Sequence, residues 1–284
     1  MTSGWKACVG AIWALVCASA TLAAEADCYE KARVPAEQRV YRVHSLVLLD
    51  ETTIFDATQQ AHIREQLGGL VQSGSIVEII TFSAFVQGRY AAPGPTLRIA
   101  APLSEETRNH MRKPDVQDFD VCVLISKKRA LNVVNATLEQ YFARATSELL
   151  RSDILGVLKE VGDSVMPRVF AKERRLVLVS DMLENSDISS FYGKGVPREI
   201  KPDEELAHAK AKGMIGDLHR ARVFVIGAGV MPAEPRRSSA LTYRASAVMG
   251  PLKKFWTDYF SRSNAQLIAF GQPLLLSPIA EGFQ

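Results

Sequence analysis

The sequence predicts an α/β protein with a doubly wound, mostly parallel sheet and helices on both faces, a Rossmann-like three-layer sandwich. Short apolar segments alternate with amphipathic segments of about ten to fifteen residues, the order expected of strand–helix–strand units with right-handed crossovers. The strand-like segments are mostly apolar, and the first of them is a continuous apolar run, which is typical of a strand covered on both faces. The chain has 284 residues, of which 47% are hydrophobic and 23% charged. This is the composition of a globular protein and not of a disordered one.

The first 24 residues have the three regions of a secretory signal peptide. A single positive charge at Lys6 precedes an uncharged apolar run, and small residues around Ala20 and Ala24 offer cleavage positions. An uncleaved anchor is the alternative, because residues 7–24 are about long enough to span a bilayer. We expect cleavage, export to the periplasm or the medium, and no membrane span in the mature chain.

The charge balance argues against a nucleic-acid partner. Cleavage after residue 24 would remove one of the 34 basic residues, Lys6, and none of the 31 acidic ones, which leaves a net charge of about +2. The charges form no long block of one sign. We therefore expect no surface dedicated to nucleic acid.

Two cysteines, Cys28 and Cys122, remain after cleavage. An even pair can form a disulfide in an oxidising compartment. The alternative is a buried Cys122 and a free thiol at Cys28 near the mature N-terminus, and the sequence leaves both open. Neither cysteine has the CxxC spacing of a thiol redox catalyst.

A polar lead-in over residues 25–42 precedes one predicted domain over residues 43–284. Residues 45–49 form a continuous apolar run, the first predicted strand, which ends at Asp50. Residues 55–73 predict an amphipathic helix, because their apolar side chains recur at helical spacing. The β-branched run at residues 76–82 predicts the second strand.

The pattern over residues 86–126 is weaker. Pro93-Gly94-Pro95 predicts a turn, residues 96–100 a short edge strand and residues 104–113 a surface loop. Residues 119–126 have the composition of a strand, or of a loop segment packed on the core.

Strands and helices alternate again in the second half. Helices are expected over residues 137–150 and 154–165, followed by a strand over residues 175–180 that ends at Asp181. The remaining elements are a helix over residues 204–220, a strand over 223–226, a helix over 252–260 and a strand over 265–270. The loop at residues 231–239, rich in proline and arginine, is expected to be mobile.

Two predicted strands end directly in an aspartate, Asp50 and Asp181. Ligands of doubly wound sheets bind beyond the carboxyl ends of the strands. Carboxylate and hydroxyl oxygens suit Mg²⁺ or another hard divalent cation. The alternative is that both aspartates cap the helices that follow, which is the more frequent role of aspartate at such positions.

Three segments resemble, in order, the loops of the metal-ion-dependent adhesion site of von Willebrand factor A (vWA) domains. They are Asp50-Glu51-Thr52 after an apolar strand, the helix start Ser152-Asp153-Ile154, and the strand end Leu178-Val179-Ser180-Asp181. The likeness spans about residues 43–270, and the sequence looks similar to uncharacterised exported bacterial vWA-like proteins. It implies that a set of four residues holds Mg²⁺ or Mn²⁺, namely Asp50, Thr52, Ser152 and Asp181. Ile54 departs from the pattern, which has a serine there, so the adhesion site is degenerate.

We therefore predict that the chain is an exported adhesion or scaffold module and not an enzyme. It would bind a partner protein at the carboxyl edge of the sheet, through a divalent cation if the site holds one. Its rim is expected to include Glu51, Thr53, Glu184 and Asn185, with Asp187 beside them. The alternative is a metal-independent structural subunit of an envelope, secretion or conjugation assembly. A phosphatase similar to haloacid dehalogenases is disfavoured, because those enzymes have Asp where Thr52 stands and Thr where Ile54 stands.

Overall fold

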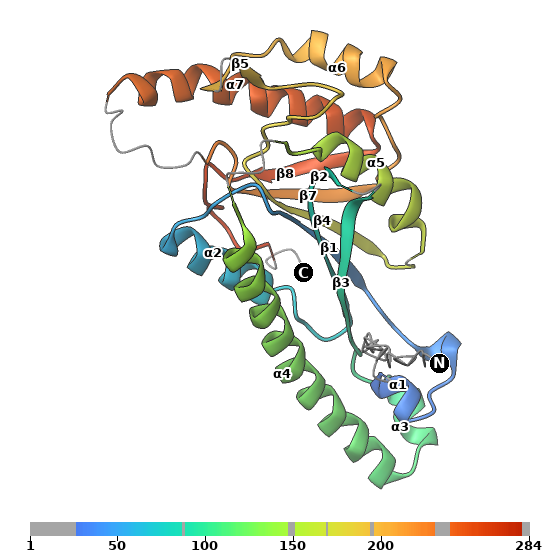
Figure 1. Cartoon of the computed structure of the whole chain (residues 1–284). Coiled ribbons are helices and arrows are strands. Elements are labelled where there is room, and N and C mark those ends of the chain that lie inside the picture. Colours follow the sequence, from blue (N-terminus) through green and yellow to red (C-terminus); the bar gives the residue numbers. More distant parts are fainter. Residues whose placement is uncertain are drawn as a thin grey trace, which may run out of the picture.

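The computed structural model describes residues 27–86, 89–146, 151–168, 170–193, 196–230 and 239–279 (Figure 1). Its main sheet has six strands in the order β3-β2-β1-β4-β7-β8. Every neighbouring pair is parallel except β2 with β3. The predicted doubly wound α/β fold is therefore confirmed. The strands are β1 Val43–Asp50, β2 Ser75–Val86, β3 Arg89–Ile99, β4 Glu173–Val179, β7 Ala221–Ile226 and β8 Ala265–Phe270.

Helices cover both faces of this sheet (Figure 1). One face packs against α5 (Ile154–Ser164), α6 (Pro202–Ala211) and α7 (Ser239–Arg262), and the other against α2 (Ala57–Gly68) and α4 (Lys113–Arg144). Side chains of the central strand β1 alternate between the two cores: Leu46 and Leu48 enter the first, Val47 and Leu49 the second. Strand β1 is buried along its whole length, which explains its continuous apolar run.

The strand predicted over residues 119–126 is wrong, because these residues lie inside the 32-residue helix α4. Phe119, Ala130 and Val134 are buried on one side of α4, and Cys122 and Val123 pack beside Phe119. This spacing is helical, but the uninterrupted apolar run over residues 121–125 is only five residues long, too short to reveal a period. The helix predicted over residues 137–150 is the last part of α4, which ends at Arg144.

The turn predicted at Pro93-Gly94-Pro95 is also wrong, because these residues belong to β3. Strand β3 lies at the edge of the sheet, where a proline is tolerated because only one side of the strand needs hydrogen-bond donors. A Cβ atom on Gly94 would lie 2.6 Å from the carbonyl oxygen of Ile79, so only glycine fits this contact. The loop predicted over residues 104–113 contains α3 (Glu105–His110), capped by Ser104.

Other boundaries differ by several residues. Helix α6 ends at Ala211 and not near residue 220, and Gly213 follows with a φ of 72°. Helix α7 begins at Ser239, well before residue 252, and contains Pro251. The short hairpin of β5 (Tyr192–Gly193) and β6 (Val196–Pro197) was not predicted from the sequence. Residues 231–238 of the loop expected to be mobile lie outside the described residues.

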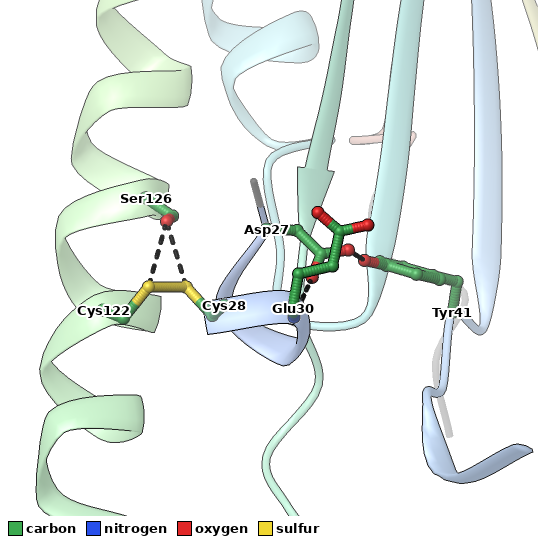
Figure 2. The surroundings of a disulfide bond; sticks show 6 residues. All are labelled: Asp27, Cys28, Glu30, Tyr41, Cys122 and Ser126. Carbon is green, nitrogen blue, oxygen red and sulfur yellow. Dashed lines mark hydrogen bonds between the residues drawn. A yellow bond between two sulfur atoms is a disulfide. The ribbon is translucent and has the colours of Figure 1, made fainter. Parts of the chain in front are cut away.

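The lead-in residues pack against the outer part of α4 (Figure 2). Cys28, in α1 (Cys28–Lys31), forms a disulfide with Cys122 of α4, the pairing that the sequence left open. Next to it, the buried Tyr29 ring lies 5.5 Å from that of Phe119, and its hydroxyl donates to the carbonyl oxygen of Ala101 at 3.0 Å. This third, small core is separate from the two cores of the sheet. Within the described ranges, no helix combines the length and apolar character needed to cross a bilayer.

We predict that Cys122→Ser lowers the free energy of unfolding by about 2–4 kcal/mol, because the disulfide closes a long loop and so restricts the unfolded chain. The two cysteines are 94 residues apart. Urea unfolding with and without a thiol reductant checks this. Reductant should destabilise the wild type and leave Cys122→Ser unchanged; equal stability of oxidised and reduced wild type would contradict the prediction.

Candidate functional site

Three loops converge at the carboxyl edge of the two central strands. Strands β1 and β4 are parallel neighbours, and their register pairs Leu49 with Val179, so Asp50 lies level with Ser180. A bridge between Ser152 and Asn185 joins the segment before α5 to the loop after β4. The structure therefore brings the predicted residues Asp50, Ser152 and Asp181 to one edge, together with the loop that follows β1.

The carboxylate of Asp50 is fully buried and accepts four hydrogen bonds. Its Oδ1 accepts from the backbone N–H of Thr52 at 3.0 Å and from the Thr52 hydroxyl at 2.6 Å. Its Oδ2 accepts from the hydroxyls of Ser152 at 3.0 Å and of Ser180 at 2.7 Å. Burial raises the pKa of Asp50, and the hydrogen bonds from Thr52, Ser180 and Ser152 oppose that rise.

Ser180 was missing from the residues predicted from the sequence. Its Oγ donates to Asp50 and accepts from the backbone N–H of Met182 at 3.0 Å. From the sequence, Ser180 was predicted only as part of the strand end before Asp181. The register of β1 with β4, which places Ser180 level with Asp50, cannot be read from the sequence.

Asp181 is the second carboxylate of the edge, and only 8% of it is exposed. Its Oδ1 accepts from the backbone N–H of Leu183 at 2.9 Å, and Tyr192 also hydrogen-bonds to its side chain. The backbone N–H of Asp181 donates to Oγ1 of Thr53 at 3.2 Å. Burial and the nearby charge of Asp50 raise the pKa of Asp181 well above its usual range. Two carboxylates thus share one desolvated region.

Neither aspartate caps a helix, so that alternative is wrong. Asp56 caps α2 through a capping box with Gln59, and the helix after Asp181 is α6, whose N-cap residue is Lys201. Throughout the part of the chain that the structure describes, no ion pair joins Asp50 or Asp181 to a cationic side chain. Among the described residues, no lysine or arginine therefore balances the negative charge that these two buried carboxylates carry when they are ionised.

A strained residue shapes the loop after β4. Met182 is fully buried and has a φ of 62°, a left-handed conformation that a side chain other than glycine rarely adopts. Its backbone N–H donates to Ser180, and its carbonyl oxygen accepts from Nε1 of Trp256 at 2.9 Å. These two bonds hold the conformation that turns the chain after Asp181.

The prediction that Glu184 lies on the rim is wrong, because its side chain is fully buried. The turn at Met182 directs it inward, where Oε2 accepts from the backbone N–H of Leu155 at the start of α5 at 2.9 Å. Burial raises the pKa of Glu184 to about 8. Glu184 therefore joins the loop to α5 and is not available to a partner.

The other predicted rim residues differ in their exposure. Glu51 is partly exposed and pairs with Arg144 at 3.4 Å. Asn185 is partly buried, and its Oδ1 accepts from the Ser190 hydroxyl at 2.8 Å. Asp187 is exposed and pairs with Arg151, whereas Thr53 is buried. Ile54, which departs from the adhesion-site pattern, is 44% exposed at the same edge.

The donor set fits a hard divalent cation in its chemistry. Each hydroxyl of Thr52 and Ser152 uses its hydrogen on Asp50, which leaves oxygen lone pairs available for a cation. With the carboxylates, these oxygens are the ligands that Mg²⁺ and Mn²⁺ prefer. No cluster of three His, Cys, Asp or Glu side chains occurs among the described residues, so hydroxyls and water would have to complete the coordination.

Comparisons with known proteins give matches among solved structures only. No family profile and no curated protein matches the sequence. An aerotolerance-related membrane protein from Bacteroides fragilis is 12% identical, with a TM-score of 0.33 over 81% of this chain and 92% of the other. The SpRpn10 VWA domain is 10% identical, with a TM-score of 0.32 over 85% and 93%. The PilB minor pilin from Streptococcus sanguinis is 12% identical, with a TM-score of 0.37 over 83% and 58%.

The doubly wound fold rests on this chain's own strand order, and the candidate site on the three loops that meet at its carboxyl edge.

We predict that Ser180→Ala lowers the free energy of unfolding by about 1–3 kcal/mol, because the buried Asp50 carboxylate loses a donor and the Met182 N–H loses its acceptor. Chemical denaturation measures the loss. The exposed Ser73 gives the matched control: Ser73→Ala should change stability little, and an equally small effect of Ser180→Ala would contradict the role given to Ser180.

We predict that Glu184 makes the protein less stable as the pH rises from 4.5 to about 8. Its pKa is about 8 in the folded chain and 4.5 ordinarily, so in this window the folded state retains a proton that the unfolded state releases. The slope contributed by one such group is up to about 1.4 kcal/mol per pH unit. Glu184→Gln removes this contribution. As the pH rises, the free energy of unfolding of the variant, measured by denaturation, should therefore increase relative to that of the wild type. A difference that stays constant with pH would refute the prediction.

Proposed function

We propose that this chain is an exported protein-binding module, which holds a divalent cation at the carboxyl edge of its sheet and uses it to bind an acidic group of a partner protein. The observation that carries the proposal is the buried carboxylate pair of Asp50 and Asp181, without a cationic side chain among the described residues. A bound cation would supply the missing positive charge.

Thr52, Ser152 and Asp181 would hold the cation, and Asp50 would fix the two hydroxyls through the hydrogen bonds that it accepts. The cation would supply an electrophilic centre for a carboxylate of the partner. Glu51, Asn185 and Asp187 lie around the edge with exposed or partly exposed side chains and would contact the partner directly.

A metal-independent scaffold is the second candidate, and the hydrogen bonding of Asp50 favours it. Its four bonds satisfy the buried carboxylate without an ion, and Ile54 replaces a hydroxyl residue of the adhesion-site pattern. In this case the same rim binds a partner whatever cation is present.

Thermal unfolding of the exported chain in EDTA, Mg²⁺ or Mn²⁺ separates the two candidates. A cation that binds only the folded state stabilises it by about 2.7 kcal/mol when present at about 100 times its Kd. We expect a higher Tm in Mg²⁺ or Mn²⁺, and we expect Asp181→Asn to abolish the rise. Asparagine retains the Oδ1 acceptor used by Leu183 and removes the charge beside Asp50, so this variant should fold.

Asp187→Asn is the matched control, because Asp187 is an exposed carboxylate of the same loop. It should retain the full rise in Tm. If millimolar Mg²⁺ or Mn²⁺ does not raise the Tm of the wild type, the proposed cation site is refuted and the metal-independent scaffold remains. Partner capture that is equal in EDTA and in Mg²⁺ would do the same.

A further inference from the structure

The outer face of α4 carries an apolar patch that the fold leaves uncovered. Val121, Leu124 and Ile125 are 54%, 71% and 51% exposed, although large apolar side chains usually pack in a core. They lie at i, i+3 and i+4, so they share one face of the helix. Cys122, Ser126 and Phe119 lie on the opposite side, which packs on α1, and Figure 1 shows this end of α4 extending away from the sheet.

Two charges of opposite sign flank the patch on the same face. Asp118 precedes Val121 by three residues, and Lys128 follows Leu124 by four; both are exposed. Among the ion pairs of the described residues, neither Asp118 nor Lys128 takes part in one. Each charge is therefore available to a partner.

The face is complementary to itself when two copies run antiparallel. Residue 123 is the midpoint between Asp118 and Lys128 and also between Val121 and Ile125. A twofold axis there places Asp118 opposite Lys128 of a second copy and Val121 opposite Ile125. A parallel pair would instead place Asp118 opposite Asp118 and Lys128 opposite Lys128. The charges thus select the antiparallel arrangement.

We propose that this face of α4 is the contact between two copies of the chain, packed antiparallel as a symmetric dimer. The apolar patch forms its centre, and two Asp118–Lys128 ion pairs close its ends. Three apolar side chains per copy make a small interface, so the dimer forms at high concentration and dissociates on dilution.

In this dimer, the carboxyl edges of the two sheets, one from each copy, would lie at opposite ends. The Tyr141 hydroxyl of α4 donates to the carbonyl oxygen of Asp50 at 2.8 Å, which places the end of the helix at the candidate site. Tyr141 lies 18 residues beyond the twofold axis, so the two sites would be about 54 Å apart along the paired helices. A partner with repeated binding groups would then engage both copies and gain avidity. The dimer does not depend on the cation proposed above.

Analytical ultracentrifugation of the exported chain over a concentration series up to the millimolar range tests the dimer. We expect a concentration-dependent dimer that Leu124→Glu abolishes. Leu276→Glu, which changes an apolar residue that is fully exposed and outside α4, should leave it intact. A monomer at every concentration, or a dimer that Leu124→Glu does not weaken, would overturn the proposal.

Charge reversal tests the geometry. Asp118→Lys and Lys128→Asp should each weaken the dimer by about tenfold or more, because each places like charges opposite one another. An equal mixture of the two variants should form a heterodimer, and the chain that carries both changes should dimerise like the wild type. Unchanged dimerisation of the single variants would exclude the antiparallel pairing. Monomeric chains that bind anionic phospholipid vesicles through Leu124 would overturn the proposal in favour of a membrane surface.

Discussion

The buried carboxylate of Asp50 is the constraint on which the candidate site depends. A desolvated carboxylate is tolerated only when its oxygens accept hydrogen bonds, and here both oxygens accept two. The donors come from the loop after β1, the start of α5 and the end of β4. One side chain on the central strand therefore fixes three segments, two of which lie 102 and 130 residues from Asp50 in the sequence.

This constraint extends to the residues behind the edge. Ser180 donates to Asp50 and accepts from Met182, so it also supports the left-handed turn after Asp181. That turn sends Glu184 into the interior, where it bonds to the first turn of α5. These hydrogen bonds hold the loop after β4 in place, which would lower the conformational entropy that binding has to overcome.

The outer part of α4 and the lead-in residues are held in a different way. Their apolar cluster is small, and such a cluster gives little stability by itself. The Cys28–Cys122 disulfide ties α1 to α4 and compensates for that small core. The same helix reaches Asp50 through Tyr141, so one rigid element connects the disulfide region to the carboxyl edge.

The sequence by itself determined the doubly wound fold and the strands β1, β2, β4, β7 and β8, because short segments rich in apolar and β-branched residues alternate with amphipathic helices. It also placed Asp50 and Thr52 at one edge, since ends of parallel strands meet there, and the resemblance to the vWA loops added Ser152. Only the tertiary structure decided the course of α4 and β3. The apolar run of five residues at 121–125 lacks a readable period, and the prolines of β3 are acceptable only at a sheet edge. The tertiary structure alone decided which side chains face the site. The register of β1 with β4 places Ser180 beside Asp50, and the left-handed φ of Met182 turns Glu184 away from the rim.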